Sequence, residues 1–280
     1  MSRRLPRPAR NNKPFQSYTP LSAHPGRRCF LTHKKMCKIA RVSKTLTLCR
    51  LWRMYRRAQP AFYMEVNLLS LEALSRNGHN LQLGEFECAG PYQIPVIQPV
   101  PAAEKIRWIP FNSARTDALR GAHGVHFFID DYLFERCWND PDRYAKLLIE
   151  FRAVLSPDFS LFTDYPPAVQ IYNHWRKHLL AVFWQQMGLT VIPSICWSDE
   201  NSFDWCFDGE PIGGTVAISS VGTQKAPEAR RLFQLGYSEM LARLKPEKIL
   251  FFGDVPEGCT GNIEKHTSFH AGLAHAQEKR

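Results

Sequence analysis

Aspartate stands at the end of four apolar segments of this chain, which read FFIDD, LFTD, CWSD and FFGD. The residues concerned are Asp130, Asp131, Asp164, Asp199 and Asp254. If these segments are parallel strands, their carboxyl ends share one rim, where loops carry the ligand site of barrels and open α/β sheets. Carboxylates gathered on a rim repel one another and need a cation or a proton. A hard divalent ion such as Mg²⁺ or Mn²⁺ is the usual cofactor, and it could polarise a phosphoryl oxygen or ionise a water molecule.

We therefore assign hypothetical catalytic and metal-binding roles to Asp130, Asp164 and Asp254. An aspartate after a strand often caps the next helix instead, and Asp131 and Asp199 suit that role as well as a hypothetical substrate-binding one. Capping suits Asp164 less, because two prolines separate it from the next predicted helix.

Other residues offer weaker signals. Trp197 could bind substrate by stacking on a ring or base, although a packed core aromatic is the simpler interpretation. His174 and His178 lie four residues apart on a predicted helix, a spacing that suits a metal pair, but without a nearby acid such a pair usually lies on the surface. Cys259, His266 and His270 are possible zinc ligands in a segment whose spacing is not that of a standard finger. The chain has no GxxxxGK phosphate loop and no GxSxG or HExxH motif.

Apolar and amphipathic segments alternate along the chain and must position these residues. We predict strands over 105–111, 124–131, 158–164, 189–199, 215–222 and 248–254, and helices over 140–155, 167–188 and 226–246. The strands are near-continuous apolar runs, which is typical of parallel strands covered on both faces. Their spacing fits right-handed βαβ units. We expect an α/β fold of repeated βα units with a mostly parallel sheet, arranged as a barrel-like or incomplete βα-barrel. An open doubly wound sheet is the alternative.

The net charge of +10 is concentrated at the N-terminus. Residues 1–63 hold 16 Lys and Arg and no acid, whereas the remainder carries 20 basic and 26 acidic residues. This segment is poor in apolar residues, so we predict that it is disordered. It could contact nucleic-acid phosphates or imitate a transit peptide. Alternatively the start is misassigned, and the product begins at Met36, Met54 or Met64.

These patterns divide the chain into three parts: a basic extension over 1–63, a single α/β domain over 64–263, and a polar tail over 264–280, helical or frayed. No apolar run approaches the roughly 18 residues that a membrane-spanning helix needs, so we expect no membrane span. Eight cysteines without CxxC spacing, and no secretory signal, predict reduced thiols in a cytoplasmic protein.

The blocks PDFS, VIPSICW, CFDG and SSVG occur in this order between Ile109 and Asp254. This stretch resembles the family known as domain of unknown function forty-four-seventeen, whose members are carried by phages, plasmids and other mobile elements. The resemblance implies a setting in mobile-element biology, in a bacterial or phage cytoplasm, and it implies no catalytic residue.

Three functions are compatible with these observations. The first is an enzyme that acts through its rim carboxylates on a phosphate-containing substrate such as nucleic acid or a nucleotide, with Arg115 or Lys225 holding the phosphate. The second is a non-catalytic accessory or binding module of a mobile element, which contacts nucleic acid through residues 1–63. The third is a barrel-type glycoside hydrolase with two rim carboxylates, in which Trp197 and Trp205 are stacking platforms.

Overall fold

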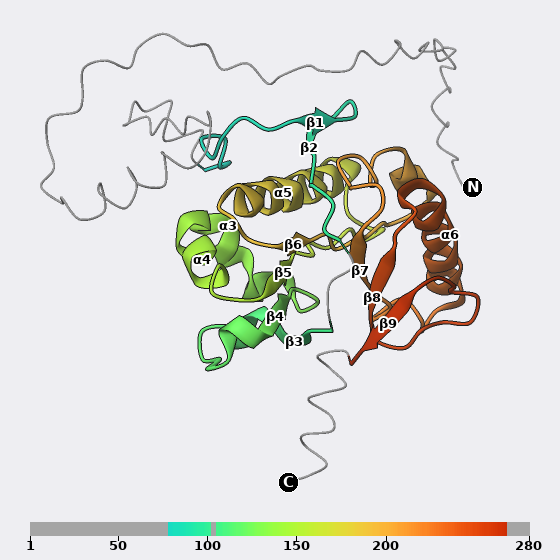
Figure 1. Ribbon diagram of the computed structural model, residues 1–280. Coiled ribbons are helices and arrows are strands. Elements are labelled where there is room, and N and C mark those ends of the chain that lie inside the picture. Colours follow the sequence, from blue (N-terminus) through green and yellow to red (C-terminus); the bar gives the residue numbers. More distant parts are fainter. Residues whose placement is uncertain (1–77, 102–104, 268–280) are drawn as a thin grey trace, which may run out of the picture.

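The computed structural model describes residues 78–101 and 105–267 of the chain (Figure 1). Helices and mostly parallel strands alternate through this part, so the predicted α/β fold is confirmed. The predicted basic extension over 1–63 and most of the tail predicted over 264–280 lie outside the described residues. Within the described part, none of the helices combines the length and apolar character needed to cross a lipid bilayer.

Seven parallel strands follow one another in chain order in two sheets (Figure 1). An isolated parallel bridge between Ser194 and Ala217 connects the two sheets. The first sheet contains β3 (Arg107–Pro110), β4 (His123–His126), β5 (Ala153–Leu155) and β6 (Val191–Ile192). The second contains β7 (Thr215–Ser219), β8 (Lys248–Phe252) and β9 (Ile263–His266). A short antiparallel pair, β1 (Cys88–Ala89) and β2 (Ile94–Pro95), precedes them.

The two end strands of this series, β3 and β9, face each other without joining. No backbone ladder connects them among the described residues, but their side chains meet, with the rings of Trp108 and His266 centred 6.4 Å apart. The strand order and this meeting of the ends are those of an incomplete βα-barrel, and the described residues form no closed barrel.

The helices lie outside the strands (Figure 1), and the two long ones begin at proline. Proline is favoured at the first position of a helix because an N–H there would have no partner within the helix, so its absence costs nothing. A carboxylate oxygen of Asp140 caps α4, accepting the N–H of Arg143 at 3.3 Å. The α-helices are α3 (Glu135–Asn139), α4 (Pro141–Leu148), α5 (Pro167–Gln186) and α6 (Pro227–Leu244). The 3₁₀ helices are η1 (Phe111–Ser113), η2 (Arg120–Ala122), η3 (Asp131–Leu133) and η4 (Glu200–Asp204).

Alternate residues of β7 and β8 pack into two different hydrophobic clusters, as expected for strands covered on both faces. One cluster joins these strands to α6 and includes Val216, Ile218, Ile249, Phe251, Phe233 and Tyr237. The other joins them to β3–β6 and α5 and includes Ala217, Leu250, Phe252, Leu155 and Trp184. Each fully buried Leu or Phe side chain contributes about 1.5–3 kcal/mol, so both faces stabilise the layer.

The chain from residue 149 to 164 differs from the prediction. The helix predicted over 140–155 ends at Leu148, and Ala153–Leu155 form strand β5. All three β5 residues are buried, and such a run fits a helical face as well as a doubly covered strand. The strand predicted over 158–164 is not formed. Asp164 therefore lies in an exposed segment before α5 and does not end a strand.

Strand β9 was not foreseen, because residues 264–266 fall in the predicted polar tail. Ile263 is its one apolar residue, so no apolar run marks it in the sequence. Its pairing with β8 sets Glu264 opposite Leu250 and His266 opposite Phe252. A parallel neighbour and ion pairs between side chains compensate here for weak β-propensity.

Candidate functional site

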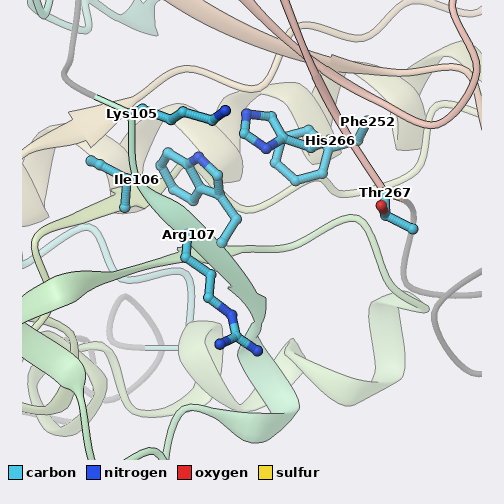
Figure 2. Close-up of a pocket in the computed structure, with 7 residues that line it drawn as sticks. Lys105, Ile106, Arg107, Phe252, His266 and Thr267 are labelled. Atoms are coloured by element: carbon cyan, nitrogen blue, oxygen red, sulfur yellow. The ribbon is translucent and has the colours of Figure 1, made fainter. Parts of the chain in front are cut away.

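A hollow of about 410 Å³ lies where β3 and β9 face each other (Figure 2). We call it the seam pocket. In Figure 2 the side chain of Lys105 reaches toward the ring of His266, beside Phe252, whereas Arg107 points away from this group. The lining residues are Lys105, Ile106, Arg107, Trp108, Phe252, His266 and Thr267.

Aromatic rings form much of the lining. The rings of Phe252 and His266 are stacked with centroids 5.0 Å apart. Trp108 meets Phe252 edge-on at 6.2 Å, and His126 and Phe128 lie 5.0 and 4.8 Å from the same ring. Such rings offer both faces and edges to a planar ligand.

A glycine on the neighbouring strand makes room for the indole of Trp108. The register between β3 and β4 sets Trp108 opposite Gly124. A Cβ atom added at Gly124 would lie 2.6 Å from two ring carbons of Trp108, which is closer than real contacts allow. The small residue on β4 thus determines how the tryptophan sits beside the pocket.

A carboxylate beside the pocket is already neutralised. Glu264 lies between Lys248, whose Nζ is 2.7 Å away, and His266, whose Nε2 is 3.1 Å away. Burial lowers the pKa of His266, and Lys248 and Lys105 lower it further, although Glu264 opposes them. His266 is therefore neutral near pH 7, and Glu264 takes its main compensation from the lysine.

Three buried nitrogen atoms at or near the pocket make no hydrogen bond: Nε1 of Trp108, Nδ1 of His126 and Nε2 of His266. Burial, together with the charge of His266, lowers the pKa of His126 to about 3, so this ring is also neutral at physiological pH. Lys105 and Arg107 are exposed, and neither takes part in the ion pairs of the described residues. The pocket therefore combines cations, an indole N–H donor and aromatic faces, which suits an anionic ligand with a planar ring.

The three aspartates with predicted catalytic and metal roles do not line this pocket. Asp130, Asp164 and Asp254 are all exposed. The carboxylate of Asp254 lies 2.8 Å from Nζ of Lys265, and this hydrogen bond lowers its pKa. Among the described residues, the group of three potential ligands whose atoms come within 4.8 Å of one another contains none of these aspartates. Their catalytic and metal-binding roles stay predictions.

The residues with predicted substrate-binding roles make structural contacts. Both carboxylate oxygens of Asp131 accept hydrogen bonds from Ser160, from its N–H at 3.0 Å and its hydroxyl at 2.8 Å. Asp199 caps η4 by accepting the N–H of Ser202 at 3.2 Å. The indole N–H of Trp197 donates to the carbonyl of Leu232 on α6 at 3.1 Å. A role in substrate binding stays a prediction for all three.

The amino-acid sequence predicts the strand over 105–111 but not strand β9, which contains His266, so it does not bring the pocket residues together. Lys105, Arg107 and Trp108 lie in that predicted strand, and His266 is only a weak zinc-ligand candidate in the sequence. One local signal was available: residues 105–108 alternate basic and apolar side chains, so one strand offers both cations and an aromatic ring. No signal linked this strand to residue 266.

Comparison with known proteins gives the chain a context. The model of a family described as "Domain of unknown function (DUF4417)" matches residues 86–269, which include the whole seam pocket. The "Gene 1 protein" of Mycobacterium phage L5 is 39% identical over 173 residues, covering 61% of this chain and 75% of the phage protein. The "Gene 1 protein" of Mycobacterium phage D29 is 37% identical over 175 residues, covering 60% of this chain and 63% of that protein, which is less than two thirds of its length. No solved structure matches the chain.

Proposed function

This chain belongs to the family described as "Domain of unknown function (DUF4417)", and from that premise we propose that it is a phage-associated binding module whose seam pocket holds one nucleotide unit. The relatives in two mycobacteriophages place the family in phage biology. The nucleotide itself is inferred from the chemistry of the pocket.

The observation that carries this proposal is that buried nitrogen atoms at the pocket, above all Nε1 of Trp108, have no hydrogen-bond partner. A buried donor without an acceptor costs about 1–3 kcal/mol. Indole N–H can only donate, so its natural complement is an oxygen or ring nitrogen of a ligand. Nucleotides carry both kinds of acceptor.

The rest of the lining suits the other parts of a nucleotide. Stacking of a base on an aromatic side chain is worth about 1–3 kcal/mol, and Trp108 and His266 offer such rings. Lys105 and Arg107 offer charges for the phosphate. Glu264 would not repel that phosphate strongly, because Lys248 lies 2.7 Å from it. A hollow of about 410 Å³ suits a small ligand and excludes a duplex.

Fluorescence anisotropy of a labelled single-stranded oligonucleotide, with unlabelled nucleoside monophosphate as competitor, tests this proposal. We expect Lys105→Ala to weaken binding by about tenfold, the loss of one charge-assisted contact. Trp108→Phe keeps a ring but removes the N–H, so it separates the donor from the stacking surface. Lys146→Ala, on the exposed side of α4, is the matched control.

Competition by the monophosphate distinguishes a nucleotide pocket from an electrostatic surface that binds only the polymer. If Lys105→Ala and Trp108→Phe bind as tightly as Lys146→Ala, the seam pocket is not the binding site. Competition that needs an oligonucleotide and fails with the monophosphate contradicts a one-nucleotide pocket.

The earlier hypothesis of an acidic Mg²⁺ or Mn²⁺ site remains a separate prediction, as does the glycoside-hydrolase alternative. Calorimetric titration of either ion tests the metal site directly. Asp164→Ala should weaken binding if Asp164 is a ligand. Because Asp164 is exposed, this substitution should leave folding intact, and unchanged affinity would exclude the role.

A further inference from the structure

A second group of chemically active side chains lies between α5 and the segment that follows η4. His174, His178 and Glu210 each offer one ligand atom, and these atoms all lie within 4.8 Å of one another. The three residues are buried, with 1%, 0% and 7% of their surface exposed. None of them lines the seam pocket.

The hydrogen bonds of His178 determine which of its nitrogens can bind a metal. Nδ1 lies 2.8 Å from the carbonyl oxygen of Pro95, and a carbonyl can only accept, so Nδ1 carries the proton. In a neutral ring the lone pair is then on Nε2, which lies 3.0 Å from a carboxylate oxygen of Glu210. Two acceptors facing each other at this distance need a proton or a metal ion between or beside them.

His174 and Glu210 present lone pairs in the same way. Nε2 of His174 lies 3.0 Å from the carbonyl oxygen of Asp208 and so carries the proton. Its other nitrogen, Nδ1, is buried and has no hydrogen-bond partner, and neither does Oε2 of Glu210. Metal-binding histidines characteristically donate their other N–H to a backbone carbonyl or carboxylate, and both histidines here meet a carbonyl.

We propose that His174, His178 and Glu210 bind a zinc ion through Nδ1 of His174, Nε2 of His178 and a carboxylate oxygen of Glu210. Two imidazoles and one carboxylate form a common zinc donor set. The two nitrogen ligands disfavour Mg²⁺ and Ca²⁺, which select oxygen.

Lys177 modifies this site without blocking it. Its ammonium donates to Oε1 of Glu210 at 2.5 Å and to the carbonyl oxygen of Ser194 at 2.9 Å. The lysine thus occupies one carboxylate oxygen and leaves the other available. Its charge also compensates Glu210 when no ion is bound, so the metal-free chain avoids an unpaired buried carboxylate and should stay folded.

The ion would act mainly as a structural link. It would join α5 to the segment around Glu210, and the carbonyls of Pro95 and Asp208 would hold the two imidazoles in place. An ion that binds only the folded chain stabilises it in proportion to the logarithm of its concentration over its dissociation constant. Zinc should therefore raise the thermal midpoint of the chelator-treated protein.

Zinc titration of the untagged full-length protein after chelator treatment tests the site, with metal content measured by mass spectrometry. We expect one zinc ion per chain that depends on this trio. His174→Gln and Glu210→Gln should each weaken zinc binding by roughly 100-fold or more, since even outer-shell changes cost 10–100-fold. His79→Gln removes an exposed imidazole and should leave the affinity unchanged.

The proposal is overturned if the chelator-treated wild-type protein binds no zinc in this titration, or if His174→Gln binds zinc as tightly as His79→Gln. Should the variants fail to fold, X-ray absorption at the zinc edge of the wild-type protein decides. A first shell with two imidazoles supports the site, and one with fewer overturns it. Nitrogen NMR of the His178 ring gives an independent check, because a doubly protonated ring that persists in the presence of zinc excludes coordination.

Discussion

A glutamate lies between a lysine and a histidine at two places in this protein. Lys177, Glu210 and His178 form a fully buried group, which we call the sealed trio. Lys248, Glu264 and His266 form a partly exposed group beside the seam pocket, which we call the seam trio. In the sealed trio, Glu210 lies 2.5 Å from Lys177 and 3.0 Å from Nε2 of His178, and no more than 1% of any of the three side chains is exposed. Without water, every proton and lone pair must be matched by the protein or by an ion. Replacing any one of these three side chains should therefore lower the stability of the protein strongly.

In the seam trio, Glu264 lies 2.7 Å from Lys248 and 3.1 Å from Nε2 of His266. Here 13–17% of each side chain is exposed, so water can share in their solvation. The comparison shows that distances alone do not define a role. The sealed trio is fully buried and so connects parts of the core. The seam trio is partly exposed and so can interact with a ligand.

The largest difference between the trios should be in stability. We expect Glu210→Gln to lower the free energy of unfolding of the metal-free protein by about 3–5 kcal/mol, because it leaves Lys177 as an unpaired buried charge. Glu264→Gln should cost less, about 1–2 kcal/mol, since water can solvate Lys248. Urea denaturation of both variants measures the two values, and equal losses would contradict the distinction.

A glycine tests the packing behind the seam pocket. Gly124→Ala should destabilise the protein by about 1–3 kcal/mol, because the added methyl group overlaps the ring of Trp108. It should also weaken ligand binding by displacing that ring. At Gly121 an added Cβ meets nothing within 4 Å, so Gly121→Ala should change stability by no more than about 0.5 kcal/mol. Similar losses in both variants would show that Trp108 adjusts freely.

Two buried groups, Asp158 and His126, should make the stability of the protein depend on pH in opposite directions. Burial raises the pKa of Asp158 from 3.8 to about 7, although Lys177 opposes this. The folded chain holds this proton more tightly than the unfolded chain, so the stability it contributes is lost as the pH rises from about 4 to about 7. Burial lowers the pKa of His126 from 6.5 to about 3. Its contribution is lost as the pH falls from about 6.5 to about 3.

Denaturant midpoints measured from pH 4 to pH 7 separate the two effects. Asp158→Asn should remove the loss toward neutral pH, and His126→Gln should remove the loss toward acid. If either variant keeps the wild-type pH profile, the corresponding group does not titrate with the shifted pKa.

The smallest effect on the pocket should come from the N-terminal segment. Deleting residues 1–63 removes 16 Lys and Arg. We expect weaker oligonucleotide binding with a smaller dependence on salt, because fewer counterions are released. Binding of the nucleoside monophosphate should stay unchanged. A matched loss for the monophosphate would mean that the segment contributes to the pocket itself.

The sequence predicts the regular elements better than the sites. Helix α5 begins at Pro167 and is followed by Gly188, which are local signals, and β8 is a nearly continuous apolar run. Strand β5 was missed because its three buried residues, which begin at Ala153 shortly after α4 ends at Leu148, continue the apolar periodicity of that helix. The predicted cluster of carboxylates at the strand ends is affected as well. Asp164 was included in it because a strand was predicted over 158–164, and that strand is not formed.

Neither candidate site is visible in local sequence, because each depends on contacts between distant segments. His174 and His178 were recognised as a possible pair, but their acid, Glu210, lies 32 residues beyond His178. Trp108 and His266 meet only because the series of seven strands curves so that its first strand, β3, faces its last strand, β9. Burial and lone-pair direction, which distinguish a metal site from an ion pair, follow from tertiary packing alone.

The junction between the two parallel sheets has a mechanical consequence. It is held by the N–H of Ile195 donating to the carbonyl of Ala217 and the N–H of Ala217 donating to the carbonyl of Pro193, each at 2.8 Å. Proline has no N–H, so the ladder cannot extend through Pro193. Under a pulling force we expect the two sheets to separate at this junction. The sheet of β3–β6 would stay with α3, α4 and α5, and the sheet of β7–β9 would stay with α6.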